Sequence, residues 1–283
     1  MPSKTPHDQP TVLGLARLAR SSALPPGDQT LYRRVAQLVE LGPQHEFIIV
    51  PAGRGLAARF LAETTGASGS GVDADPALIE SAAASAREAG LDSRLHFDPA
   101  PGPELPYKDD VFDLAIGNVG LSTSVDAARA VRELARVTKP MGAIVLIQPV
   151  WNRAVEPGRR DMLIEHLGTR PYLLVEWKQM LREAGVVELI VEDLTASANP
   201  WQPMLGAGGV VEDLLSFGDR AELLLRVLRQ WGWRGVGQAI RGMRELRALV
   251  ARERILGLAL IKGTRWAERP AAVRPRPPTD GGA

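Results

Sequence analysis

The sequence contains no cysteine. This absence excludes disulfide bonds, thiolate nucleophiles, iron–sulfur clusters and zinc sites built on cysteine. Because a chain without disulfides needs no oxidising compartment, we expect the protein to function in the cytoplasm. Histidine is also scarce, at four residues, so few side chains can take up and release a proton near neutral pH.

The chain also lacks an excess of charge and a long hydrophobic run. Its 34 lysines and arginines nearly balance 33 aspartates and glutamates, which leaves a net charge of +1. Such a balance produces no overall field that attracts nucleic acid, and nucleic-acid binding is not expected. No stretch approaches the ~20 apolar residues of a membrane-spanning helix, and the N-terminus is polar where a signal peptide is apolar. The sequence therefore predicts neither secretion nor a transmembrane segment.

The remaining composition is that of a globular protein, with 45% hydrophobic and 24% charged residues in 283 positions. Proline-rich ends, residues 1–10 and 267–283, predict flexible tails. Residues 11–266 form one predicted domain, which begins with N-terminal helices over residues 11–45. Helical periodicity in residues 195–254 predicts an inserted helical lid near its end.

Short apolar runs alternate with helical patterns through residues 46–150, the predicted cofactor-binding core. The first run, Phe47–Val50, is continuously hydrophobic, as a strand buried on both faces requires. Strands separated by helices form right-handed βαβ units and a mostly parallel sheet. The predicted fold class is therefore α/β, with a Rossmann-like doubly wound sheet. The other expected strands end at Asp73 or cover Leu95–Phe97, Asp113–Ile116, Ala143–Gln148, Val187–Val191 and Leu256–Ile261. The expected helices cover Leu56–Glu63, Pro76–Ala89, Ser124–Val137 and Trp177–Ala184.

A glycine turn, Gly53-Arg54-Gly55, follows the first of these strands. A turn between a strand and a helix presents free N–H groups and the positive end of the helix dipole to a polar or anionic ligand. Asp73 ends the next strand, where its carboxylate can accept hydrogen bonds from two ribose hydroxyls. The pattern predicts a nucleoside cofactor. Gly53, Gly55 and Ala58 also match G-x-G-x-x-A, so a dinucleotide such as NAD is an alternative.

Four sequence motifs follow one another between Phe47 and Pro149. They are Ile49–Gly55 (IVPAGRG), Gly71–Pro76 (GVDADP), Leu105–Tyr107 (LPY) with Phe112–Leu114 (FDL), and Leu134–Ala143 (LARVTKPMGA). In these motifs the chain resembles the class I S-adenosylmethionine-dependent methyltransferases, in their type 11-like branch that acts on small molecules. The last two motifs have no counterpart in dinucleotide oxidoreductases, which disfavours NAD.

The resemblance implies a seven-stranded sheet whose last strand is antiparallel, with the insertion at 195–254 covering the substrate. It also implies a methyltransferase that acts on a small, partly apolar molecule, with S-adenosylmethionine as the cofactor. The cofactor-binding residues that it implies are Ala52, Gly53, Gly55, Asp73, Ala74 and Asn118. It implies no metal and does not identify a catalytic residue.

The chain departs from the family pattern at three positions. Ile49 stands where the first motif has an acid that helps to hold the cofactor ammonium, and Pro51 replaces the first glycine. Proline has no N–H to donate and fixes φ, so the turn takes another shape. Pro101 stands where the family often has an aspartate near the adenine. These changes weaken the predicted cofactor site, and they favour an alternative function, a catalytically inactive binding or assembly subunit with the methyltransferase fold.

The predicted lid is rich in arginine. Residues 226–254 contain eight arginines and two glutamates, a local charge of +6. Such a stretch with Trp231 and Trp233 fits a protein partner or an anionic surface, or a solvated helix face. Tryptophans 201, 231 and 233 either line a substrate pocket or pack the lid onto the sheet. His166 is a candidate general base, although partly buried histidines commonly have no catalytic role.

Overall fold

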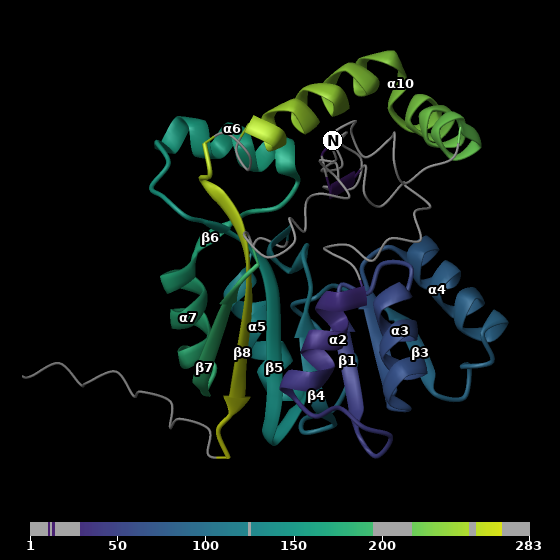
Figure 1. Ribbon diagram of the computed structural model, residues 1–283, viewed down its shortest axis with the longest axis vertical. Helices are drawn as coiled ribbons and strands as arrows, with labels where there is room; N and C mark the ends of the chain where they lie inside the picture. Colours follow the sequence, from purple (N-terminus) through teal and green to yellow (C-terminus); the bar gives the residue numbers. More distant parts are fainter. Residues whose placement is uncertain are drawn as a thin grey trace, which may run out of the picture.

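A computed structural model describes residues 11, 13–14, 29–123, 126–194, 217–248 and 253–267. Figure 1 shows the chain from the N-terminus in purple to the C-terminus in yellow. The predicted tail at residues 1–10 lies outside the described residues, and so does the predicted tail from residue 268 onward. Most of the predicted first helix also lies outside the described residues, and so does the first part of the predicted lid, residues 195–216.

A single mixed sheet forms the centre of the molecule. Its strands follow the order β3-β2-β1-β4-β5-β8-β7, and the two-residue β6 pairs with β5 outside this path. All pairs from β3 to β5 are parallel, whereas β8 is antiparallel to both β5 and β7. This confirms the predicted doubly wound sheet with an antiparallel last strand. The strands are β1 (Glu46–Val50), β2 (Ser68–Asp73), β3 (Leu95–Pro99), β4 (Phe112–Gly117), β5 (Thr138–Trp151), β6 (Tyr172–Leu173), β7 (Val186–Asp193) and β8 (Leu256–Arg265).

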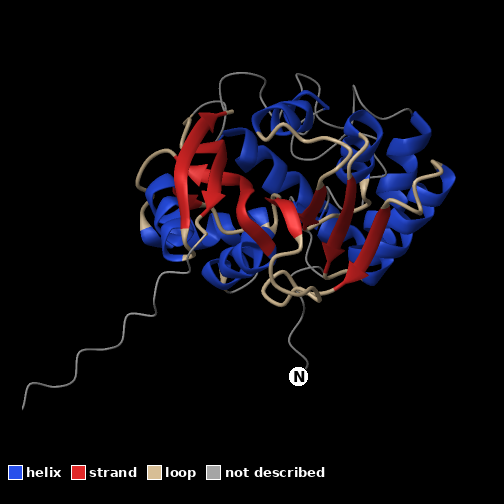
Figure 2. Ribbon diagram, turned by 90° about the horizontal axis from the view of Figure 1, so that it is seen from below, coloured by secondary structure: helices blue, strands red, loops and turns tan. Residues whose placement is uncertain are grey.

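Helices cover both faces of the sheet (Figure 2). One apolar cluster joins the sheet to the helices α2, α3 and α4, and a second joins it to α5 and α7. Buried strand residues alternate between the two clusters, as Ile48 and Ile49 of β1 do, because successive side chains of a strand point to opposite faces. The helices are α2 (Gln29–Leu38), α3 (Leu56–Thr65), α4 (Pro76–Glu88), the 3₁₀ turn η2 (Leu121–Thr123), α5 (Ala127–Val137), α6 (Pro157–Leu167), α7 (Leu174–Glu183) and α10 (Phe217–Arg247).

Side-chain caps fix where two of the helices begin. The Asp75 carboxylate accepts a hydrogen bond from the N–H of Ala77 at the start of α4, and Pro76 occupies the first helical position. Asp126 accepts from the N–H of Arg129 in the same way at α5. A cap of this kind satisfies an N–H that the helix itself leaves without a partner. The predicted start of α4 is therefore confirmed.

The fifth strand and the segment after it differ from the prediction. β5 begins at Thr138, directly after α5, and not at Ala143, because Thr138 already pairs with Phe112 of β4. A register shift separates this pair from the next, and Met141 within it takes a positive φ of 66°. Helix α6 was not predicted, although its start signal is present. Glu156 caps the N–H of Arg159, and Pro157 takes the first helical position.

The lid contains one long helix with a kink. α10 runs through much of the helical lid predicted at residues 195–254, and Gly232 interrupts it with a φ of 66° and a ψ of −174°. Because only glycine adopts this conformation at little cost, the kink lies at this residue. α10 packs against α6 and lies beyond the edge of the sheet where the parallel strands end (Figure 1).

Candidate functional site

The candidate site lies where β2, β1 and β4 end side by side. β1 pairs with β2 on one side and with β4 on the other. The strand order reverses here, because the chain continues from β1 to β2 and β3 on one side and then crosses to β4 on the other. Open α/β sheets bind ligands at the carboxyl ends of the strands beside such a reversal. The turn after β1, Asp73 at the end of β2 and Asn118 after β4 meet at this edge.

The two glycines of the turn after β1 have different surroundings. Both take a positive φ, 55° at Gly53 and 73° at Gly55. A Cβ on Gly55 would lie 2.9 Å from both the Cβ of Ala82 and the Cζ of Phe97, whereas a Cβ on Gly53 would meet no atom within 4 Å. Gly55 is therefore required for packing α3 against α4 and β3, and Gly53 borders open space.

Asp73 is almost fully buried, with 1% of its surface exposed. Its Oδ2 accepts a 3.0 Å hydrogen bond from the N–H of Gly53, and its Oδ1 accepts a 3.1 Å bond from the N–H of Asp75. A carboxylate has about four lone-pair positions, so it can hold the glycine turn and accept a ribose hydroxyl together. The predicted pair of Gly53 and Asp73 thus forms one connected unit.

Asn118 follows β4 and is buried. Its N–H donates a 2.7 Å hydrogen bond to the carbonyl of Val50, which ties it to the end of β1. Its side-chain oxygen accepts a 2.9 Å hydrogen bond from the hydroxyl of Tyr32 on α2. Burial raises the pKa of Tyr32, although the bond to Asn118 acts in the opposite direction. The hydroxyl therefore stays protonated and is the donor of this hydrogen bond. The role of Tyr32 could not be predicted from the sequence, because nothing in an amphipathic helix indicates a partner 86 positions away.

Gln148 of β5 is a second residue that the sequence analysis missed. It is fully buried, and its Nε2 donates to the carbonyls of Gly117 at 2.9 Å and of Asn118 at 2.7 Å. The Asn118 carbonyl also accepts from the N–H of Leu121. Gln148 therefore fixes the turn after β4, and its own Oε1 has no hydrogen-bond partner. The only signal for this role in the sequence is a glutamine in an otherwise hydrophobic strand.

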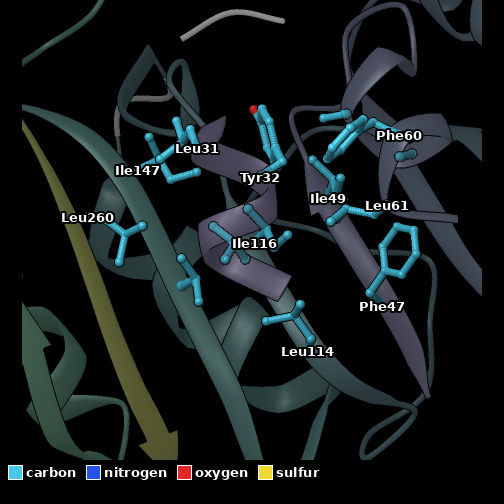
Figure 3. Close-up of a cluster of buried hydrophobic side chains, with 14 of the residues drawn as sticks. Leu31, Tyr32, Phe47, Ile49, Phe60, Leu61, Leu114, Ile116, Ile147 and Leu260 are labelled. Carbon is cyan, nitrogen blue, oxygen red and sulfur yellow. The ribbon is translucent and has the colours of Figure 1, made fainter. Parts of the chain in front are cut away.

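The three departures from the family pattern have clear structural places. Ile49 is fully buried in the cluster that joins β1 to α2 and α3, as Figure 3 shows, so no acid faces the turn from this position. Pro51 follows Val50 through a cis peptide bond. Pro101 is exposed, and the nearby Asp98 accepts a 2.6 Å hydrogen bond from the hydroxyl of Tyr107. Asp98, in β3, thus already has a partner in the loop between β3 and β4.

The two later motifs hold each other in place. Arg136, in the LARVTKPMGA motif, donates to the carbonyls of Leu105 and Tyr107 in the LPY motif. Glu133 accepts from the N–H of Leu105 at 3.0 Å and from Arg136 at 2.7 Å. The bond from Arg136 lowers the pKa of Glu133, and it outweighs burial, which acts to raise that pKa. These motif residues shape the loop between β3 and β4.

The other predicted site residues are less closely connected. Ala52 is buried against Gly71, and Ala74 is exposed beyond Asp73. His166 lies partly buried in the last turn of α6. Trp233 is 77% exposed and so neither lines a pocket nor packs the lid, while Trp201 lies outside the described residues. Within the described ranges, no three acidic or histidine side chains converge as metal ligands would.

These residues fit a nucleoside cofactor. The free space beside Gly53 admits a ligand close to the backbone, and the adjacent Asp73 carboxylate can accept ribose hydroxyls. The fit is weaker where the amino acid end of S-adenosylmethionine would lie, because Ile49 and Pro51 offer neither an acid nor an N–H. Tyr32 and Asn118 are polar side chains that hydrogen bonds connect to the end of β1.

Comparison with known proteins gives a consistent family. Residues 50–146 match the sequence profile described as a methyltransferase domain. The methyltransferase GfsG of Streptomyces halstedii is 26% identical over 69% of this chain and 74% of its own. The demethylmenaquinone methyltransferase of Corynebacterium urealyticum is 28% identical over 75% of this chain and 77% of its own.

Solved structures share the fold. A putative sarcosine dimethylglycine methyltransferase from Galdieria sulphuraria superposes with a TM-score of 0.70 at 16% identity, over 85% of each chain. The [4+2]-cyclase SpnF superposes with a TM-score of 0.66 at 23% identity, over 85% of this chain and 82% of its own. Because these neighbours carry different activities in their names, they establish the fold alone. The profile match and the named relatives show that residues 50–146 form a methyltransferase domain, and in its sheet, glycine turn and Asp73 the chain is similar to the class I S-adenosylmethionine-dependent methyltransferases.

Proposed function

We propose that the protein methylates a small, partly apolar molecule and binds S-adenosylmethionine over Gly53 at the carboxyl edge of the sheet. The observation that carries this proposal is the hydrogen bond between the Asp73 carboxylate and the N–H of Gly53, with open space beside that glycine. The bond places a buried acceptor directly beside a glycine whose side-chain position is open. A ribose at this position would be held by Asp73 and would lie against the backbone.

Each residue of this edge has a distinct part in the proposed site. S-adenosylmethionine supplies an activated methyl group. Asp73 accepts ribose hydroxyls, and Ala52, Gly53 and Ala74 form the wall beside them. Gly55 keeps α3 close to α4 and β3, so its part is to shape the turn. Asn118 closes the edge beyond β1, held there by Tyr32 and Gln148. Methyl transfer depends mainly on alignment of the acceptor with the methyl group, so this site needs no triad or metal.

The acceptor is proposed as a class and not as a compound. Relatives are named for acting on demethylmenaquinone and on sarcosine and dimethylglycine, which differ widely in size and polarity. Val227 of α10 is a buried apolar residue in the predicted lid, and this supports an acceptor with an apolar part. We also propose that the reaction takes place in the cytoplasm, where a chain without cysteine meets no redox constraint.

Calorimetric titration with S-adenosylmethionine and S-adenosylhomocysteine tests the proposal. We expect micromolar binding to the wild type and binding weaker by roughly 10–100-fold in Asp73→Asn, since a charge-assisted hydrogen bond contributes about 1.5–3 kcal/mol. Asp75→Ala is the matched control, because it removes the α4 cap beside the site and should leave affinity unchanged. Far-UV circular dichroism confirms that each variant is folded.

Two outcomes contradict the proposal. Absence of binding by the folded wild type at millimolar ligand would favour the alternative, a non-catalytic binding or assembly subunit. Equal affinity of the wild type and Asp73→Asn would show that the cofactor binds without Asp73, and the site would have to be sought elsewhere.

A further inference from the structure

Helix α10 exposes large hydrophobic side chains. Trp233 is 77% exposed, Leu225 is 53% exposed and Ile240 is 51% exposed. Single exposed hydrophobic residues are ordinary in soluble proteins, but several on one element indicate an interaction surface. Beyond its kink at Gly232, the helix presents Trp233 and Ile240 seven positions apart, which is two helical turns and the same side.

The opposite side of this half of the helix faces the protein. Gly235 and Gly242, again seven positions apart, are buried. Small residues allow the backbone of a helix to approach its neighbour closely, and α10 packs against α6. The buried Gly235 and Gly242 and the exposed Trp233 and Ile240 therefore lie on opposite sides of this half of the helix.

Exposed arginines accompany these hydrophobic residues. Every charged side chain of α10 that the structure describes is an arginine: Arg229, Arg234, Arg241 and Arg244. Arg244 lies eleven positions after Trp233 and four after Ile240, which continues the same side of the helix. Arg234 and Arg241 flank this side, seven positions apart. We call the five residues Trp233, Arg234, Ile240, Arg241 and Arg244 the outward face of α10.

The arginines of the outward face lack the acidic partners that several, though not all, arginines of the body have among the described side chains. On the body, Arg34 pairs with Glu192 at 2.5 Å, and Arg129 pairs with Glu104 at 2.9 Å. None of the three arginines of the outward face forms an ion pair with a side chain in the described part of the chain. A helix face that is merely solvated needs no exposed tryptophan and isoleucine among its charges. The combination therefore points to an occupant that is both anionic and apolar.

We propose that the outward face of α10 docks on the surface of an anionic membrane. Arginines meet the lipid phosphates, to which the guanidinium group is well matched. Trp233 and Ile240 enter the boundary between headgroups and acyl chains, where tryptophan is favoured. Nucleic acid would satisfy the arginines but would leave these apolar side chains in water. Docking is peripheral, since no helix in the described ranges is both long and apolar enough to cross a bilayer.

The position of α10 gives this docking a direction. The helix lies beyond the edge of the sheet that carries Gly53, Asp73 and Asn118 (Figure 1). A membrane against the outward face would therefore lie on the same side of the molecule as the candidate site. The proposal does not depend on the proposed methyl transfer, and its test needs neither cofactor nor acceptor.

Sedimentation with lipid vesicles tests the proposal. Vesicles of phosphatidylcholine with phosphatidylglycerol are compared with vesicles of phosphatidylcholine alone, at physiological ionic strength and with the full-length protein. We expect the wild type to sediment with the anionic vesicles only. The triple variant Arg234→Glu, Arg241→Glu, Arg244→Glu should bind them roughly 100-fold more weakly, because each basic residue near the surface contributes about 1 kcal/mol.

Two further variants separate the charge from the hydrophobic contribution and from general effects. Trp233→Ser with Ile240→Ser should weaken binding at least tenfold, although all three arginines of the outward face remain. A control carries the same three charge reversals on exposed arginines of other helices, Arg87→Glu, Arg132→Glu and Arg182→Glu. It should retain most of the wild-type binding, since these residues lie outside the outward face. Asp73→Asn should bind vesicles as the wild type does, so failure of the cofactor site cannot be mistaken for failure of docking.

Three results would overturn the proposal. The first is wild-type binding to neutral vesicles that equals binding to anionic ones. In the second, the three charge reversals of the control variant would weaken binding to anionic vesicles as much as the three charge reversals on the outward face. The third is a wild-type protein that ignores vesicles but forms a dimer, by light scattering, that Trp233→Ser with Ile240→Ser dissociates, which would assign the outward face to a second copy of the chain.

Discussion

The hydroxyl of Tyr32 donates a 2.9 Å hydrogen bond to the side-chain oxygen of Asn118. Both residues are buried, and they join α2, which precedes the sheet, to the segment that follows β4. Because the N–H of Asn118 also binds the end of β1, this hydrogen bond connects α2 to the candidate site. The helix therefore supports the candidate site as well as covering the sheet.

Removal of the Tyr32 hydroxyl should destabilise the protein. Tyr32→Phe leaves the buried Asn118 oxygen without its donor, and we expect the free energy of unfolding to fall by about 1–3 kcal/mol in urea denaturation. Tyr172→Phe, at a partly buried tyrosine of β6, is the control and should change stability by less than about 0.5 kcal/mol. Equal effects of the two variants would mean that the bond to Asn118 contributes nothing measurable.

The two glycines of the turn after β1 should respond differently to alanine. At Gly55 the new Cβ would be only 2.9 Å from Ala82 and Phe97, so overpacking adds to backbone strain and should cost roughly 2–5 kcal/mol of stability. At Gly53 only the strain of about 1–2 kcal/mol applies, but the Cβ would fill the open space. Gly53→Ala should therefore remain folded and bind S-adenosylmethionine poorly. Thermal unfolding and calorimetry measure the two effects, and unchanged affinity of folded Gly53→Ala would contradict the proposed cofactor position.

Glu133 should give the protein a component of stability that acid removes. The Arg136 guanidinium lowers the pKa of Glu133 in the folded state, against the opposing effect of burial. This contribution is present above the unfolded pKa of about 4.3 and is lost as the pH falls through the lower folded pKa. Glu133→Gln should thus lower stability at neutral pH and flatten its decline in acid. Urea unfolding between neutral and acidic pH measures this, with the exposed Glu104→Gln as control. A wild type and Glu133→Gln with parallel pH profiles would be evidence against the linkage.

Gln148 allows a test with almost no change in shape. Gln148→Glu replaces a buried donor to the carbonyls of Gly117 and Asn118 by an acceptor, which should cost roughly 2–4 kcal/mol at neutral pH. Burial raises the pKa of a carboxyl group in such a place. The protonated acid can donate one hydrogen bond, so stability relative to the wild type should recover as the pH falls toward the unfolded pKa and be lost as it rises. The exposed Gln37→Glu should show no such dependence of stability on pH. If Gln148 does not support the turn, the stability of both variants should follow that of the wild type at every pH.

The order of elements in the core could be predicted from the sequence, because it depends on local patterns. The apolar run at Phe47–Val50 and the cap at Asp75 are legible without knowledge of their neighbours, and both are confirmed. The antiparallel last strand came from the resemblance to the methyltransferase family and not from any pattern within the strand. Helix α6 was missed because its apolar periodicity is weak, although its cap and proline mark its start.

The candidate site divides in the same way. Gly53 and Asp73 could be predicted, because a turn and a strand end are local features, and the structure joins them by a hydrogen bond. Tyr32 and Gln148 could not, since their partners lie far away in the sequence and neither belongs to a motif. The exposure of Trp233 could not be predicted either, because it depends on how α10 lies against the rest of the protein and not on a local pattern.

The place of β8 in the sheet has a consequence for synthesis of the protein. β8 lies between β5 and β7 and is antiparallel to both, yet the ribosome makes it after either of them. From the end of β5 to the end of β8, translation takes on the order of ten seconds. During that time the hydrophobic edge of β5 has no neighbour on one side, and exposed strand edges invite pairing with other chains. We therefore expect the nascent protein to need a chaperone at this stage, and to fold most safely when translation through the lid is fast.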